Sequence, residues 1–184
     1  MIELQAVAQI QHLALATWWS RELAVFLARW SIYLNVILAA VLLTSGRKKE
    51  IHGVVEVAWS AALALVLTTL LAFLIQRVRP YLASSDVALL IPAPLNTSFP
   101  SGHTATAVAI AVAFWMTRRD LGLWSCAVAA LVAMGRMAVG VHYPSDILGG
   151  IGVGLISYGI VNLIHQQLHR RDLPRQPHGK PKAT

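Results

Sequence analysis

Residues 54–80 read VVEVAWSAALALVLTTLLAFLIQRVRP. Up to Ile75 the only charged side chain is that of Glu56, and the run is long enough for a membrane helix, which takes ~20 predominantly apolar residues. Arg77, Arg79 and Pro80 then end the apolar character within a few positions. The stretch therefore predicts a transmembrane helix from residue 54 to residue 75, with two arginines at its end.

Four more apolar stretches accompany this one, over about residues 23–44, 104–117, 121–139 and 147–164. The stretch from 104 is short for a membrane span unless Ser101 and His103 belong to its first turn. Residues 3–20 are weaker and amphipathic, and Trp18 and Trp19 are placed as interfacial aromatic residues are. We expect an all-α, polytopic membrane bundle of five transmembrane helices plus an N-terminal interfacial helix, with a sixth membrane helix as the alternative.

The composition of the chain also indicates a bilayer protein. It is 57% hydrophobic and 12% charged, with a mean hydropathy of +0.61, whereas soluble domains carry about 25% charged residues. The net charge of +7 raises the possibility of a nucleic-acid partner. The basic residues lie in short clusters at the ends of apolar runs rather than along one polar face, so we expect no nucleic acid.

The basic clusters predict how the chain is oriented. They occupy residues 47–49, residues 118–119 and the segment after residue 169, which fall on one side of a five-helix bundle. The positive-inside rule makes that side cytoplasmic, so the loops over 76–100 and 140–145 lie outside. We expect residues 1–170 to form a single membrane domain. The remaining residues, 171–184, are rich in Pro and Lys and should form a disordered, basic cytoplasmic tail.

The first candidate motif is Pro100-Ser101-Gly102-His103, at the outside start of a helix. Ser101 suits an N-cap, and Gly102 lets a backbone approach a ligand closely. Free N–H groups and the helix dipole at such a terminus bind anions, which would place His103 beside a bound phosphate. The alternative is an ordinary capped helix with an interfacial histidine.

The second candidate motif runs from Arg136 to Asp146, between two apolar stretches. Pro144 suits the opening of the next helix, and Asp146 then lies in its first turn, where the dipole favours a carboxylate. His142 stands four residues earlier, so Asp146 is expected to orient its imidazole. The alternative is a surface His–Asp pair at a helix cap, but an arginine at an outside helix end argues against it.

Together with Arg79-Pro80, these segments resemble the type 2 phosphatidic acid phosphatase superfamily, which also includes the vanadium haloperoxidases. The signature of that family is Lys-x6-Arg-Pro, then Pro-Ser-Gly-His, then Ser-Arg-x5-His-x3-Asp. The order and spacing match over roughly residues 54–165. Two positions depart from the signature, because Ala72 stands at the lysine position and Gly135 at the serine position.

The resemblance implies a lipid-phosphate phosphatase without a metal or another cofactor. His142 would attack phosphorus, Asp146 would orient its imidazole, and His103 would protonate the leaving oxygen. Phosphate contacts would come from Arg79, Arg136 and the groups around Ser101 and Gly102, with Arg77 or Gln76 in place of the missing lysine. Asp86 and Asp146 are the only carboxylates expected on this face, and they form no cluster suited to Mg²⁺.

The short chain and the segment from Ser98 to His103 look like bacterial undecaprenyl pyrophosphate phosphatases, which act at the outer face of the plasma membrane. The expected partners are therefore a lipid phosphate or diphosphate and the bilayer. Other substrates remain open, namely phosphatidylglycerol phosphate, phosphatidic acid and a lipid A phosphate. Readings of a different class are an anion or lipid transporter, and an inactive homologue as Ala72 suggests.

Overall fold

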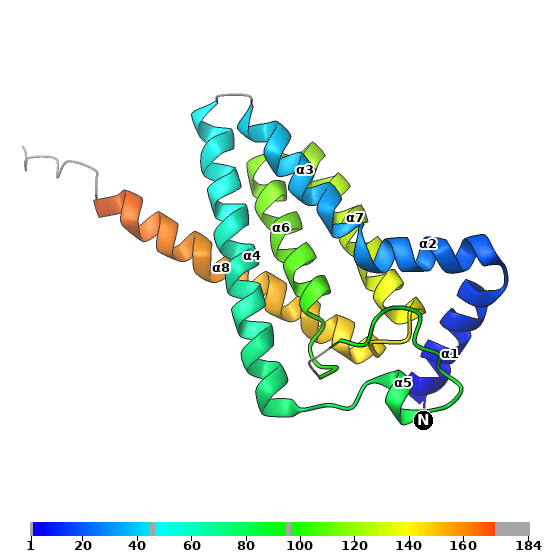
Figure 1. Cartoon of the computed structure of the whole chain (residues 1–184). Helices are drawn as coiled ribbons and strands as arrows, with labels where there is room; N and C mark the ends of the chain where they lie inside the picture. The colour runs from blue at the N-terminus through cyan, green and yellow to red at the C-terminus, as the bar shows by residue number, and fades with distance from the viewer. Residues whose placement is uncertain (1, 45–46, 95–96, 172–184) are drawn as a thin grey trace, which may run out of the picture.

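The computed structural model describes residues 2–44, 47–94 and 97–171 (Figure 1). All regular secondary structure in these ranges is helical, as predicted. The tail from residue 172 lies outside the described residues, so the prediction of a disordered tail stays a prediction. The helices are α1 (Ile2–Leu15), α2 (Trp18–Arg29), α3 (Ile32–Leu43), α4 (Lys48–Ile75), α5 (Pro80–Ala83), α6 (Gly102–Thr117), α7 (Arg119–Ala138) and α8 (Pro144–Arg171).

Helix α6 is the centre of the bundle and packs against α4, α7 and α8 (Figure 1). Its alternate positions carry small side chains that are almost fully buried, namely Ala105, Ala107, Ala109, Ala111 and Ala113. Small residues let neighbouring helix backbones approach closely. On α8, a Cβ at Gly150 would lie 2.7 Å from the Ser101 carbonyl oxygen, so only glycine fits where α8 crosses the start of α6.

The predicted helix over residues 23–44 is wrong, because this segment forms two helices. Helices α2 and α3 meet at an angle of 50°. Between them, the buried Ser31 donates its hydroxyl to the Leu27 carbonyl at 2.6 Å. A serine that bonds back to the residue four positions earlier often bends a helix. The break therefore has a local cause that apolar character alone did not reveal.

Three described helical stretches are long and apolar enough to cross a membrane: 50–83, 119–138 and 144–168. The bent pair α2–α3 is a fourth if it counts as one span. Helix α6 is apolar but has 16 residues, about 24 Å at 1.5 Å per residue, against a hydrocarbon core of about 30 Å. The count of five membrane helices therefore stays a prediction.

The two ends of the bundle differ in chemistry. At one end, called here the basic end, Arg118 pairs with the buried Glu50 at 3.5 Å, which joins the start of α4 to the α6–α7 junction. At the opposite end, called the site end, α4 and α7 finish while α6 and α8 begin (Figure 1). The structure thus separates the predicted basic loops from the predicted site residues, and the assignment of the basic end to the cytoplasm stays a prediction.

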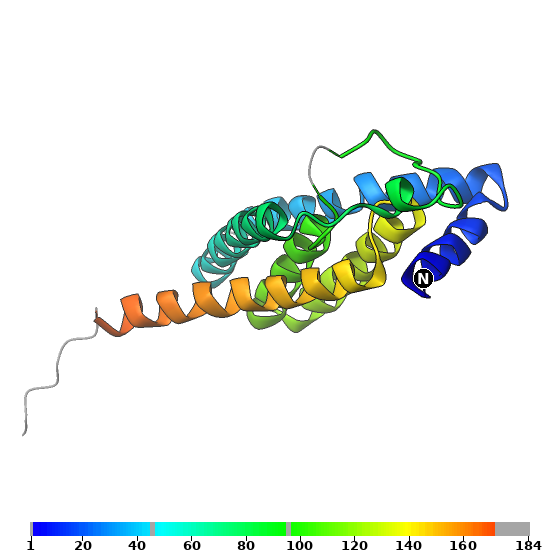
Figure 2. The same ribbon diagram turned by 90° about the horizontal axis from the view of Figure 1, so that it is seen from below.

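Helix α1 packs against the site end (Figure 2). Its Gln11 is 2% exposed, and the side-chain amide donates to the Ala88 carbonyl at 2.7 Å and accepts from the Ala88 N–H at 2.7 Å. The same amide donates to the Ala138 carbonyl at 3.2 Å. Helix α1 therefore fixes the loop after α5 and the end of α7. The expectation that it lies in the membrane interface stays a prediction.

Candidate active site

A cavity of about 330 Å³ lies at the site end, where α4, α6 and α7 meet the loop before α8. Apolar side chains and threonines from α3, α4 and α6 form one part of its wall. The rest includes two guanidinium groups and two imidazoles from separate segments. These four residues are Arg79, His103, Arg136 and His142. The structure thus brings together residues that stand up to 63 positions apart in the sequence.

Arg79 reaches the cavity from the extended segment after α4, just before Pro80 opens α5. Its side chain is almost fully buried, with the residue only 3% exposed. One terminal nitrogen donates to the Val141 carbonyl at 2.8 Å, and the other donates to the Thr97 carbonyl at 2.9 Å. These bonds fix the orientation of the planar guanidinium, which suits it to pairwise recognition of phosphate oxygens.

Arg136 enters the cavity from the last turn of α7 and is 5% exposed. Its Nη1 donates to the Ala28 carbonyl at 3.4 Å, and its Nε has no hydrogen-bond partner within the described parts of the chain. Burying a guanidinium donor without a partner is costly. An anion in the cavity would supply the missing acceptor.

Gly135 stands where the signature has a serine, and the packing of α7 on α2 explains this difference. A Cβ at this position would lie 2.6 Å from the Ala28 nitrogen and 2.7 Å from the Leu27 carbonyl carbon. Both are backbone atoms of α2, so a serine would push the two helices apart. This close packing also brings the Ala28 carbonyl to Arg136.

The start of α6 presents Gly102 and His103 to the cavity. Ser101 is the predicted N-cap, since its hydroxyl accepts from the Thr104 N–H at 3.5 Å. Its own N–H donates to the Asp146 carbonyl at 3.0 Å, and it is absent from the described cavity lining. The geometry therefore does not support the expected phosphate contact of Ser101. The first N–H groups of α6 and its dipole still favour an anion at this end.

His142 lies in the short loop between α7 and α8 and is 2% exposed. Its Nδ1 is 3.6 Å from Asp146 Oδ2, which is an electrostatic contact and longer than a hydrogen bond. Burial lowers the pKa of His142 to about 4, and the neighbouring Arg136 and Arg79 act in the same direction while Asp146 opposes them. The imidazole is therefore neutral at pH 7, which is the form that can act as a nucleophile.

Asp146 lies in the first turn of α8, which Pro144 opens, as predicted. Its carboxylate is fully buried and accepts several hydrogen bonds. Oδ1 accepts from Arg77 Nη1 at 2.7 Å, while Oδ2 accepts from the Tyr143 N–H at 2.8 Å and from the Ser98 hydroxyl. This network leaves Oδ2 facing the His142 ring and fixes the carboxylate in place.

Arg77 is placed differently from the expectation. It is absent from the described cavity lining, and its side chain runs behind Asp146, where it also contacts Ser145 Oγ at 2.5 Å. Its guanidinium carbon stands 4.1 Å from the centre of the Tyr143 ring. The geometry therefore does not support Arg77 as a phosphate contact in place of the missing lysine. At position 72, the buried Ala72 carbonyl accepts from the Thr97 hydroxyl at 2.9 Å.

The sequence motifs assigned no role to Ser98 or Glu3, which the structure connects to the site. Ser98 bonds directly to Asp146, and Glu3 Oε2 accepts from Arg77 Nη2 at 2.6 Å. One signal was available, because Glu3 is the only acidic residue among the first 20 positions. Its target could not be predicted, because Arg77 is 74 positions away.

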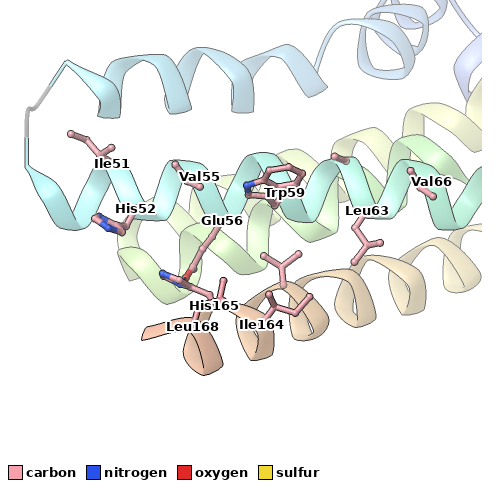
Figure 3. Close-up of a pocket in the computed structure, with 12 residues that line it drawn as sticks. Ile51, His52, Val55, Glu56, Trp59, Leu63, Val66, Ile164, His165 and Leu168 are labelled. Carbon is pink, nitrogen blue, oxygen red and sulfur yellow. The ribbon is translucent and has the colours of Figure 1, made fainter. Parts of the chain in front are cut away.

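A second cavity of about 780 Å³ lies between α4 and α8, away from the site end (Figure 3). Its wall is apolar except for His52, Glu56 and His165. The Glu56 carboxylate contacts His165 Nδ1 and so joins α4 to α8. No arginine or lysine belongs to the described lining of this groove.

Comparisons with known proteins identify a family and several relatives. The family model described as the PAP2 superfamily matches residues 53–170. The chain is 30% identical over 154 residues to the putative undecaprenyl-diphosphatase YbjG of Escherichia coli (strain K12), covering 82% of this chain and 76% of that protein. It is 29% identical over 135 residues to the undecaprenyl-diphosphatase BcrC of Bacillus subtilis (strain 168), covering 73% and 69% respectively.

Among solved structures, the crystal structure of Aquifex aeolicus LpxE is similar with a TM-score of 0.69. The two chains are 28% identical, and the similarity covers 89% of this chain and 96% of that one. The fold is therefore shared over most of both chains.

Proposed function

The chain belongs to the PAP2 superfamily and is a membrane lipid phosphatase, and we propose that it converts undecaprenyl pyrophosphate to undecaprenyl phosphate. The names of the relatives support this substrate. One observation carries the chemistry: the buried Arg136, whose Nε has no hydrogen-bond partner among the described residues, faces the same cavity as His103 and His142. Such a cavity suits an anion that a neutral imidazole attacks.

The first step of the proposed reaction is attack on the terminal phosphorus. Arg79, Arg136 and the N–H groups at the start of α6 hold the phosphate oxygens and stabilise their charge in the transition state. His142 Nε2 forms the new bond to phosphorus while the bond to the bridging oxygen breaks. His103 gives a proton to that leaving oxygen, and undecaprenyl phosphate departs. Asp146 stabilises the positive charge that develops on the His142 ring.

The second step is hydrolysis of the phosphohistidine. His103, now without its proton, accepts one from water, and the water oxygen attacks phosphorus. The bond between phosphorus and His142 Nε2 breaks, which releases inorganic phosphate and restores both histidines. The 3.6 Å contact between His142 Nδ1 and Asp146 shortens as the imidazole becomes charged, as catalytic contacts do when substrate binds.

We also propose that the site faces the non-cytoplasmic side of a bacterial plasma membrane and that the C-terminus is cytoplasmic. The gathering of the arginines at residues 47 and 118 around Glu50, at the opposite end, supports this orientation. A cysteine placed at the exposed Ser85, with Cys126 replaced by alanine, tests it. Labelling by an impermeant maleimide in intact cells is expected, and protection until the membrane is opened would reverse the orientation.

The test of the proposed function is phosphate release in detergent with EDTA present. Wild type and His142→Ala are compared on undecaprenyl pyrophosphate, phosphatidylglycerol phosphate, phosphatidic acid and a lipid A phosphate. We expect wild type to prefer the polyprenyl diphosphate and the variant to be inactive. Preference for another lipid would change the substrate and keep the mechanism. No release from any lipid would favour the transporter or inactive-homologue alternatives, and loss of turnover through EDTA would contradict the metal-free mechanism.

A further inference from the structure

Glu3, in the first turn of α1, contacts two segments of the site end at once. Its Oε2 accepts from Arg77 Nη2 at 2.6 Å, and its Oε1 accepts from the Ser145 N–H at 3.0 Å. Hydrogen bonding from Ser145, and then from Arg77, lowers the pKa of Glu3, so its side chain is a carboxylate at neutral pH. Glu3 therefore ties the end of α4 to the first turn of α8.

Arg77 connects Glu3 to the buried part of the site. One terminal nitrogen bonds to Glu3 and the other bonds to Asp146 Oδ1 at 2.7 Å, while the Tyr143 ring lies against the guanidinium. The side chains become progressively more buried along this path, from 39% exposed at Glu3 through 29% at Arg77 to 0% at Asp146. A surface carboxylate is thus three contacts away from His142, with Arg77 and Asp146 between them.

We propose that Glu3 is a positioning residue for the reaction, acting through Arg77 and the start of α8 to hold Asp146 beside His142. This inference rests on the proposed function. Glu3 is absent from the described cavity lining, so it acts without touching substrate. Helix α1 is then part of the support of the active site.

Arg77 is shared between the carboxylates of Glu3 and Asp146, and this sharing affects the charge of Asp146. A guanidinium paired with Asp146 alone would neutralise that carboxylate and be free to draw it away from His142. Glu3 takes up the second terminal nitrogen and balances the charge, so Asp146 keeps negative charge for the imidazolium that forms during attack. The bond from the Ser145 N–H to Glu3 also fixes the helical turn that carries Asp146.

The kinetic test compares Glu3→Gln and Glu3→Ala with wild type, using Glu22→Gln as the matched control. Glu22 lies on neighbouring α2, is 60% exposed and pairs only with Arg21 among the contacts described. We expect kcat to fall on the order of 10-fold or more in both Glu3 variants, because small displacements of catalytic groups have effects of this size. KM should change less than twofold, and Glu22→Gln should match wild type.

A double-mutant cycle adds a readout that general loss of stability would not produce. Arg77→Gln alone should lower kcat, and Glu3→Gln should add little in that background, because the two residues act through one contact. Additive losses would overturn the proposal. So would wild-type kcat in Glu3→Gln, a rise in KM at unchanged kcat, or an equal loss in Glu22→Gln.

A measurement without lipid separates this inference from the proposed function. In protein labelled with ¹⁵N-histidine, the ring signals of His142 are identified by their absence in His142→Ala. They should shift in Glu3→Gln and stay in place in Glu22→Gln. If the wild type hydrolyses none of the lipids and the His142 signals still shift in Glu3→Gln, the proposed phosphatase function is refuted and the positioning role is kept. Unchanged ring signals in an active enzyme would refute the positioning role alone.

Discussion

Helix α4 contributes residues both to the cavity at the site end and to the groove between α4 and α8. The groove is the larger, at about 780 Å³ against about 330 Å³. Along the groove, two helices meet side by side and contribute mainly apolar side chains with one Glu–His pair (Figure 3). At the site end, helices begin and finish, and each terminus brings free backbone groups and a loop.

This difference explains where the chemistry gathers. The middle of a helix has its backbone N–H and C=O groups satisfied internally, so only side chains can serve a ligand there. Helix ends expose both kinds of backbone group, and here carbonyls of Val141, Thr97 and Ala28 orient the two cavity arginines. Cavity size alone would favour the groove, whereas the convergence of helix ends favours the site end as the active site.

The largest effect that we expect from a side chain with no covalent role is that of Arg136→Met. It removes a proposed phosphate contact, so kcat/KM should fall about 10³-fold, the usual cost of losing a transition-state donor. The thermal midpoint in detergent should hold or rise, because a buried guanidinium with an unpartnered Nε is also removed. Arg29→Met, at an exposed position of α2, is the control. If Arg136→Met lowered the thermal midpoint and the folded protein kept the kcat/KM of wild type, the role of Arg136 would be structural.

The second prediction concerns the effect of pH on stability. The pKa of His142 in the folded chain is about 4, below the ordinary value of 6.5. Between these two pH values, His142 is protonated in the unfolded chain and neutral in the folded chain. The stability contributed by a neutral His142 is complete above about pH 6.5 and is lost as the pH falls toward 4. The full loss is on the order of 3 kcal/mol, because each pKa unit corresponds to about 1.4 kcal/mol.

The measurement is the thermal midpoint between pH 7 and pH 4.5 for wild type, His142→Gln and His12→Gln. The decline should be shallower in His142→Gln, whereas His12→Gln, at an exposed position of α1, should follow wild type. Identical slopes for all three proteins would mean that His142 titrates alike in the folded and unfolded chain. The buried, arginine-flanked description of the cavity would then be wrong.

The local features of the site end were predictable from the sequence, because each depends on neighbouring residues. Ser101 as an N-cap, Pro144 as the opening of a helix and Asp146 in its first turn follow from capping rules. The apolar runs predicted the positions of the long helices, although α4 begins and α8 ends several residues outside the predicted bounds.

Features that depend on distant contacts were not predictable. The prediction of Ser101 as an N-cap does not reveal that the Ser101 N–H donates to the Asp146 carbonyl. This bond leaves Ser101 without a free N–H donor for a ligand in the cavity. The position of Arg77 depends on Glu3, and the bend at Ser31 interrupts a run that composition presents as continuous. Contacts between segments far apart in the sequence decide the first two outcomes, and the hydrogen bond from Ser31 to Leu27 decides the third. Hydrophobic periodicity carries no information about any of these contacts.

A third prediction uses the close packing of α2 on α7. Gly135→Ser restores the family signature, yet its Cβ would lie 2.6 Å from backbone of α2. We expect a loss of ~1–3 kcal/mol, the usual cost of overpacking, seen as a lower thermal midpoint. Gly152→Ser on α8 is the control, since a Cβ there meets nothing within 4 Å. A stabilised Gly135→Ser would show that α2 can move away and that its packing does not hold Arg136.

The smallest effect belongs to the groove, where Glu56→Gln makes the same kind of change as Asp146→Asn makes at the site end. Both replace a carboxylate beside a histidine with a neutral amide of nearly equal shape. Asp146→Asn should lower kcat by at least about 100-fold, because the His142 imidazolium loses its counter-charge. Glu56→Gln should keep kcat within twofold and change stability by less than about 1 kcal/mol, because the pair is partly exposed.

Phosphate release and thermal unfolding of the two variants, measured side by side, compare the regions directly. If Glu56→Gln abolished turnover at an unchanged thermal midpoint, the groove would belong to the catalytic machinery, and a helix middle would carry chemistry that we assign to helix ends alone.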